Sequence, residues 1–181
     1  RGSKADIWEG GHRVPFVVRW TGMVEAASQS DQTITLVDFF ATVSDITGEK
    51  APGMAEDSVS FLPALSGQAI VSSRKGIIHH SISGHFAYRQ GKWKLLLAKG
   101  SGGWSSPKES EVGAKAAPAQ LYNMEKDPSE QNNLYLSRPD VAERLLADLT
   151  LDVQRGRSTD GTEAKNDVLN IKLWKSQRGR K

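Results

Sequence analysis

Two short apolar runs with a tight turn between them constrain the fold of this chain most. The runs, residues 86–90 and 92–98, are separated by little more than Gly91, within an Arg-Gln-Gly-Lys stretch. A turn this short joins neighbouring antiparallel strands. Similar runs lie at 76–81 and 120–124. The sequence therefore predicts a small antiparallel four-stranded sheet, and alternating lysines and apolar residues at the start of the third strand indicate one dry and one wet face.

A helix is predicted after the last of these runs. Its apolar residues recur at helical spacing from Pro139, and Gly156 stands just beyond its end, as is typical of helix termini. These apolar residues are Val141, Leu145, Leu146 and Leu149. Residues 99–118 are rich in Gly, Ser, Lys and Ala, which favours a surface loop. The predicted unit is of the α+β type, a small sheet packed by one helix.

A strand and a second helix are predicted nearer the start of the chain. Residues 14–20 are almost continuously apolar, as in a buried strand, and such a strand needs a larger sheet to cover it. The helix that follows is expected to be capped by Ser30 or Asp31 and to end at Gly48. This pair indicates the end of an α/β domain.

Two aspartates of this helix, Asp38 and Asp45, have no partner at metal-binding spacing, so we expect them on solvated helix surface. Residues 52–67, which follow, are rich in Gly, Pro, Ser and acidic residues, with a short apolar patch near the end. This composition predicts a long connection with one helical turn and favours a domain boundary there.

Composition excludes several classes of protein. Of the 181 residues, 38% are apolar and 25% charged, and no apolar run approaches the roughly 20 residues that a membrane-spanning helix requires. Without cysteine there are no disulfides and no thiol chemistry.

The chain has no initiating Met and no signal-peptide pattern, so we expect it to be truncated at its start. The net charge is only +3, and the basic excess gathers in a tail: Lys172, Lys175, Arg178, Arg180 and Lys181.

The segment from Lys4 to Pro15 is the most informative for function. Two adjacent glycines before the predicted strand allow a sharp turn or a close approach of the backbone, and Glu9 and Arg13 are placed to brace that turn. From the residues alone, a braced loop is favoured over a specific anion site.

Several stretches closely resemble the sulfatases of the alkaline phosphatase superfamily. Lys-x-x-x-x-Glu-Gly-Gly-x-Arg-Val-Pro, followed by Phe-Val-Val-Arg-Trp, resembles the second signature region of that family. Further resemblance lies at 35–42, at 79–81 with 88–95, and at 121–134. The order is kept over roughly residues 1 to 160. The resemblance therefore identifies the chain as the carboxy-terminal portion of an arylsulfatase-like protein.

The resemblance implies a domain arrangement. Residues 1–67 would be the end of the large catalytic α/β domain, 68–157 the small antiparallel domain, and 158–181 a polar basic tail. It also implies a periplasmic or secreted location. The expected partners are a sulfated small molecule or carbohydrate and the missing amino-terminal portion of the same protein, with neither nucleic acid nor a membrane span.

The resemblance also implies hydrolysis of a sulfate ester by a formylglycine hydrate, made from Cys or Ser, beside a calcium ion. Lys4 would bind the sulfate oxygens, where a preorganised cation stabilises charge that gathers in the transition state. Neither cofactor is expected on residues of this chain. The signature Cys/Ser-x-Pro-x-Arg is absent, because the nearest match, from Ser105 to Lys108, is followed by Glu109. We therefore expect the segment to be inactive alone.

Three histidines and a tryptophan are the substrate-binding candidates. His79 and His80 are adjacent on a predicted strand, so they point to opposite faces, and His85 begins the neighbouring strand. One or two of them are expected to reach the leaving-group side of the substrate, although a packed or surface histidine is as frequent. Trp104, in the loop, is placed either to stack on a sugar or aryl group or to pack as a loop anchor.

Other residues and functions have simpler interpretations. His12 is expected at a variable loop position, and Trp93 and Tyr122 in the core of the small sheet. Three alternatives to a sulfatase remain open: a phosphodiesterase or phosphonate hydrolase of the same superfamily, a noncatalytic ligand-binding module, and a polyanion binder acting through the basic tail.

Overall fold

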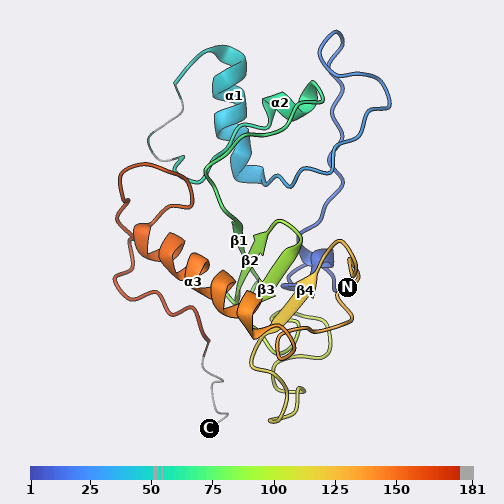
Figure 1. Ribbon diagram of the computed structural model, residues 1–181, viewed down its shortest axis with the longest axis vertical. Helices are drawn as coiled ribbons and strands as arrows, with labels where there is room; N and C mark the ends of the chain where they lie inside the picture. Colours follow the sequence, from blue (N-terminus) through green and yellow to red (C-terminus); the bar gives the residue numbers. More distant parts are fainter. Residues whose placement is uncertain (51–52, 54, 176–181) are drawn as a thin grey trace. The chain divides into compact units, whose positions relative to one another are not determined.

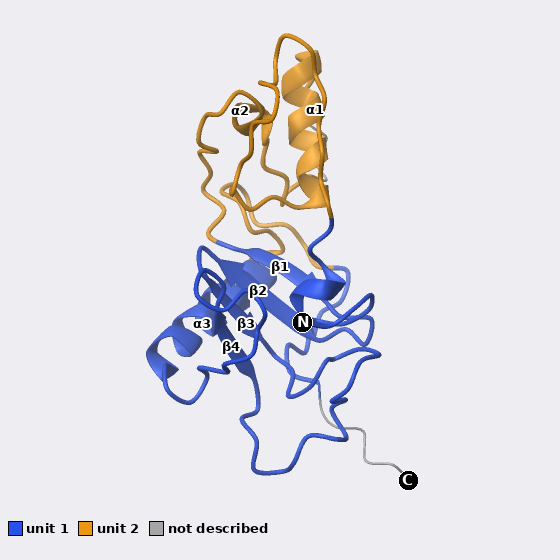
Figure 2. Ribbon diagram, turned by 90° about the vertical axis from the view of Figure 1, so that its right-hand side faces the viewer, with its two compact units in different colours: residues 1–14, 76–153, 167–181 blue, residues 15–75, 154–166 orange. Residues whose placement is uncertain are grey.

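The computed structural model describes residues 1–50, 53 and 55–175, which form two compact units (Figure 2). The first unit contains residues 1–14 and 76–153 and the described chain from Asp167 onward. The second contains residues 15–75 and 154–166. The domain boundaries expected from the sequence concern the whole protein and stay predictions.

The first unit is built on four antiparallel strands in the order β1-β2-β3-β4 (Figure 1). The strands are β1 (Ile77–His80), β2 (Phe86–Gln90), β3 (Trp93–Leu96) and β4 (Gln120–Asn123). Gly91 has a φ of 53° between β2 and β3, a left-handed conformation that glycine adopts without strain. The predicted small antiparallel sheet is confirmed.

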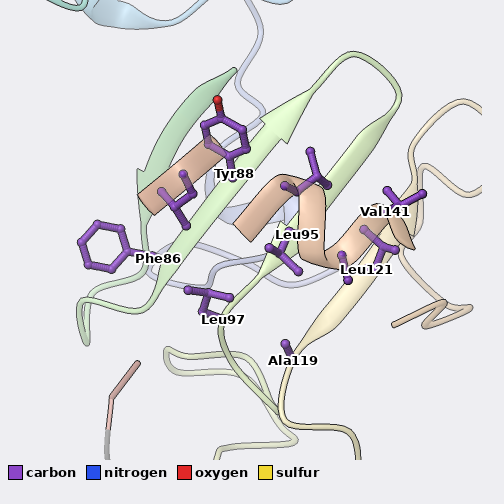
Figure 3. Packing of buried hydrophobic residues seen from close by; sticks show 10 residues of the cluster. Phe86, Tyr88, Leu95, Leu97, Ala119, Leu121 and Val141 are labelled. Atoms are coloured by element: carbon purple, nitrogen blue, oxygen red, sulfur yellow. The ribbon is translucent and has the colours of Figure 1, made fainter. Parts of the chain in front are cut away.

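Helix α3 (Pro139–Arg155) lies across one face of this sheet (Figure 1). Side chains of the strands and of α3 meet there in one apolar cluster, shown in Figure 3. The cluster consists of Phe86, Tyr88, Leu95, Leu97, Ala119, Leu121, Val141, Ala142, Leu145 and Leu149. Trp93 packs against it, as does Leu173 of the tail. The predicted helix and its apolar face are thus confirmed.

The opposite face of the sheet is covered by the start of the chain. Ile7 and Trp8 pack there against a second cluster, which also contains Ala87, Leu96, Ala98, Tyr122 and Met124. The indole Nε1 of Trp8 donates a hydrogen bond of 3.0 Å to Oε1 of Gln120. The prediction of a wet face on the third strand was wrong, because Lys94 on that face is 0% exposed.

The second unit contains short helices: η2 (Leu36–Asp38), α1 (Phe39–Thr47) and α2 (Leu62–Leu65). Gly48 ends α1 with a left-handed φ of 72°, as predicted. The predicted cap was wrong: the helical region begins after Thr35, whose side chain forms a capping box with Asp38. Asp38 also pairs with Arg74 and is 1% exposed, so its expected place on solvated surface was wrong. Asp45 is exposed, as predicted.

Residues 14–20 do not form a strand in the structure. Phe16 packs edge-on against Phe39 and Phe61, but Val17 is 90% exposed. A strand needs a partner for its backbone groups, and none of the described strands pairs with this segment. The prediction of a strand at residues 14–20 was therefore wrong for the chain by itself. The larger sheet that such a strand needs stays a prediction.

Two further features were expected from composition. Across the described residues, no helix is both long enough and apolar enough to cross a membrane. The basic tail is exposed at Lys172 and Lys175. Arg178, Arg180 and Lys181 lie outside the described residues, so their expected surface position stays a prediction.

Candidate functional site

Lys4 lies on an exposed, tightly constrained turn. The backbone N–H of Asp6 donates to the carbonyl oxygen of Ser3 over 3.1 Å, which closes the turn. Ala5 has a φ of 82°, a conformation that residues other than glycine rarely adopt. Its carbonyl oxygen accepts a hydrogen bond of 2.9 Å from the N–H of Ile82. The ammonium of Lys4 is thus presented to solvent by a backbone that is held on both sides.

A single carboxylate joins this turn to the loop that carries Trp104. Asp6 accepts hydrogen bonds from the backbone N–H groups of Ser3, Trp104 and Ser105, over 2.8, 2.8 and 3.0 Å. Burial alone raises the pKa of Asp6, but the side chain of Ser105 and these backbone hydrogen bonds outweigh it and hold the pKa below its usual value. The carboxylate is therefore ionised, and most of its hydrogen bonds come from the backbone.

Further contacts hold the 101–105 loop against the same turn. The N–H of Ile7 donates to the carbonyl oxygen of Ser101 over 2.8 Å, and the hydroxyls of Ser3 and Ser105 lie 3.1 Å apart. The indole of Trp104 remains 60% exposed. The structure thus places Lys4 and Trp104, two predicted site residues 100 positions apart in sequence, on neighbouring segments.

His85 lies beneath this loop. It is buried, its Nδ1 lies 3.0 Å from the carbonyl oxygen of Leu97, and its backbone N–H donates to the hydroxyl of Ser81 over 3.2 Å. A methyl group built on Gly102 would lie only 3.3 Å from the ring. In this chain His85 packs under the loop that bears Trp104, and its expected contact with a substrate stays a prediction.

His79 and His80 lie on opposite faces of β1, as predicted. The rings of His79 and His12 pack at an interplanar angle of 53° with centroids 4.0 Å apart, and Nε2 of His79 lies 3.4 Å from the carbonyl oxygen of Ile7. Burial, with the nearby Lys94 and His12, lowers the pKa of His79 to about 2. His80 packs on Phe86 at 4.2 Å on the other face, away from the Lys4 turn.

His12 was expected at a variable loop position, but its ring is partly buried against His79. Burial and Lys94 lower the pKa of His12. Its Nε2 is buried without a hydrogen-bond partner within the described part of the chain. Both rings are therefore held neutral.

A buried ion cluster was missed by sequence reasoning. Nζ of Lys94 lies 2.8 Å from Oε1 of Glu9 and 2.8 Å from Oε1 of Glu130. The second carboxylate oxygen of Glu130 accepts from the backbone N–H of Glu9 over 2.7 Å. Burial raises the pKa of Glu9, but the attraction of Lys94 lowers it by more, so the pKa lies below its usual value. The residue that pairs with Glu9 and so braces the Gly10–Gly11 turn is thus Lys94 of β3.

The described residues contain no group of three or more His, Asp or Glu side chains that could hold a metal ion. The exposed side chains near the Lys4 turn offer a cation and an aromatic surface. The calcium ion and the formylglycine expected for the full-length enzyme stay predictions.

Comparison with known proteins gives one consistent family. The sequence model of the family described as Sulfatase matches residues 1–49. An N-acetylgalactosamine-6-O-sulfatase of Bacteroides thetaiotaomicron is 31% identical over 146 residues, covering 80% of this chain and 28% of the relative. An ulvan-active sulfatase of Formosa agariphila is 31% identical over 77% of this chain and 32% of its own length.

A solved structure agrees with the fold. It comes from work on glycosaminoglycan metabolism by Bacteroides thetaiotaomicron and is 29% identical, with a TM-score of 0.68 over 85% of this chain and 32% of that one. The chain thus spans about a third or less of the length of the relatives that it matches.

Proposed function

Because the chain belongs to the sulfatase family, we propose that it forms the carboxy-terminal part of an enzyme that hydrolyses sulfate esters. Within that enzyme it contributes a sulfate-binding lysine and part of the substrate pocket. The formylglycine and the calcium ion, contributed by the preceding portion, would supply the nucleophile and a Lewis acid. We also propose, from the resemblance alone, that the enzyme is secreted or periplasmic.

The observation that carries this proposal is the geometry of the Lys4 turn. An exposed ammonium sits on a turn whose backbone is closed by Asp6 and held by Ile82. Negative charge gathers on the oxygens of the sulfuryl group as the ester bond breaks, and a cation that is already in place stabilises it without reorganisation. Lys4 therefore binds the sulfate oxygens and lowers the barrier for release of the alcohol.

The exposed Trp104 supports a substrate with a ring. An indole presents a flat apolar surface of the kind that stacks on a sugar or aryl group. Two relatives carry names that refer to carbohydrates, an N-acetylgalactosamine-6-O-sulfatase and an ulvan-active sulfatase. We therefore propose a sulfated carbohydrate as the substrate, with Trp104 and one or more of His79, His80 and His85 near the leaving group.

The test is an assay of the longer protein with a sulfate and a phosphate ester of the same alcohol. We expect turnover of the sulfate ester and a loss of about 100-fold or more in kcat for Lys4→Ala, since removal of one charge-stabilising donor costs that much elsewhere. Lys126→Ala, which removes an exposed lysine of the same unit, is the matched control and should be silent. A strong preference for the phosphate ester would favour a phosphodiesterase of the same superfamily.

A further inference from the structure

Asp6 occupies a position where two segments of the proposed pocket meet. Its side chain is 0% exposed. Oδ2 accepts from the N–H of Ser3, on the turn that carries Lys4, and Oδ1 accepts from the N–H groups of Trp104 and Ser105. One short side chain thus bonds to the backbone of both segments, which lie about 100 positions apart in sequence.

The two segments approach each other so closely that only glycine fits at their contact. A methyl group on Gly103 would lie 2.4 Å from the carbonyl oxygen of Ala5 and 2.6 Å from Oδ1 of Asp6. Both distances are well inside van der Waals contact, and neither neighbour is the free end of a flexible side chain. Because Ala5 itself has a positive φ, the turn depends on the bonds around it to keep this conformation.

Asp6 is poorly suited to act on a substrate directly. An exposed carboxylate beside Lys4 would repel a sulfate, but both oxygens of Asp6 are engaged by backbone N–H donors and the side chain is buried. Three N–H dipoles offset its charge. The same arrangement explains the residue type, since an asparagine would turn an NH₂ group toward a backbone donor and lose at least one bond.

We propose that Asp6 is a positioning residue that holds the Lys4 turn and the Trp104 loop in one fixed arrangement. The lysine that binds sulfate and the indole that faces the attached ring then act on the same substrate molecule. This inference rests on the proposed function. It adds that the two groups are coupled, so that displacing the loop also displaces the lysine.

The test uses the longer protein with two substrates, nitrophenyl sulfate and N-acetylgalactosamine 6-sulfate, the latter chosen from the name of a relative. Trp104→Ala should raise KM about tenfold for the sugar ester alone, as expected when a stacking contact is lost. Asp6→Asn should lower kcat/KM about 100-fold for both esters, because a small displacement of a charge-stabilising group is enough. In the Asp6→Asn protein, Trp104→Ala should have no further effect.

A structural readout and controls separate positioning from general stability. Hydrogen exchange should show lost protection at the amides of Trp104 and Ser105 in Asp6→Asn, with β3 and α3 unchanged. The same substitution at exposed Asp167, in the same unit, is the matched control and should be silent. If Asp6→Asn does not fold, Gly103→Ala leaves Asp6 intact and should reproduce both effects.

Two outcomes would overturn the inference. One is a folded Asp6→Asn protein with unchanged kcat/KM and protected amides. The other is a full additional effect of Trp104→Ala in the Asp6→Asn background. Failure of the proposed function looks different: Lys4→Ala would then leave both turnover and the binding of inorganic sulfate unchanged, while the exchange measurement still shows whether Asp6 holds the loop.

Discussion

The two faces of the small sheet are covered by different kinds of structure. On one face, α3 packs a continuous apolar cluster against the strands. On the other, residues 1–14 cover an apolar patch but also bury Lys94 between Glu9 and Glu130. Asp6 and the packed rings of His12 and His79 lie on the same segment or beside it. Hydrophobic burial tolerates small rearrangements, whereas charged and hydrogen-bonded groups require fixed geometry. The polar face is thus the one suited to hold Lys4 in place.

The largest effect is expected from Lys94→Ala. Removing the ammonium leaves Glu9 and Glu130 facing each other, with Glu130 fully buried. Breaking a buried ion pair from one side costs about 3–5 kcal/mol. We expect a loss of that size in the free energy of unfolding, measured by urea denaturation of the longer protein and assigned to this unit by hydrogen exchange in β3.

Lys92 provides the control, since it lies two residues earlier and is exposed. Lys92→Ala should change stability by less than about 0.5 kcal/mol. A small effect of Lys94→Ala, similar to that of Lys92→Ala, would show that the ion cluster contributes little and would remove the contrast between the faces.

The apolar face is tested by Leu145→Ala. Leu145 is 0% exposed in the cluster between α3 and the sheet. Such a truncation leaves a cavity and costs about 2–5 kcal/mol, less where neighbours relax into it. Half-exposed Leu151, on the same helix, is the control. We expect Leu145→Ala to lower stability without changing exchange at Trp104, whereas Lys94→Ala should affect both. Equal effects on that loop would mean that the two faces are not independent.

The difference between the two faces of the sheet also explains how much of the fold could be predicted from the sequence. The α3 face follows from local periodicity, since Val141, Leu145 and Leu149 recur at helical spacing and a single glycine closes the hairpin. The polar face depends on pairs that are far apart in sequence. Nothing near Lys94 indicates that Glu9 and Glu130 approach it, so a lysine alternating with apolar residues was predicted to face water.

The residues of the candidate site also differ in whether the sequence could predict them. Lys4 was predicted through its family motif, and Trp104 was predicted because an aromatic residue in a Gly-rich loop lacks a packing partner in the sequence. Asp6 was missed, because its three donors include two amides almost 100 positions away. The sequence did contain one indication of this role. An aspartate three residues after a serine, as Asp6 is after Ser3, can accept a hydrogen bond from the backbone of a turn.

A pH titration separates the faces further. The pKa of His79 is lowered from 6.5 to about 2 in the fold, so the unfolded chain binds a proton below pH 6.5 that the folded chain does not. Its contribution to stability is fully present above pH 6.5 and falls by about 1.4 kcal/mol for each pH unit below it. We expect His79→Gln to flatten the dependence of the urea midpoint between pH 6.5 and 5. Burial and Lys175 also lower the pKa of His80 on the other face, so His80→Gln should remove a smaller part of this dependence. An unchanged slope in His79→Gln would contradict the assignment.

The smallest expected effect tests whether the α3 face is as purely apolar as its cluster indicates. The hydroxyl of Tyr88 donates a hydrogen bond of 2.8 Å to Oδ2 of Asp152 on α3, and burial with this carboxylate raises the pKa of the phenol far above its usual value. Tyr88→Phe keeps the ring and removes one bond, so we expect a loss of about 1 kcal/mol in unfolding free energy, measured beside wild type in urea. Because the pKa of the phenol is raised in the fold, the unfolded tyrosine ionises first, so the difference should be constant between pH 7 and 9 and shrink as the pH rises to 10 and above. A loss comparable to that of Leu145→Ala would show that a polar contact also fixes the position of α3, and the contrast between the faces would then be one of degree.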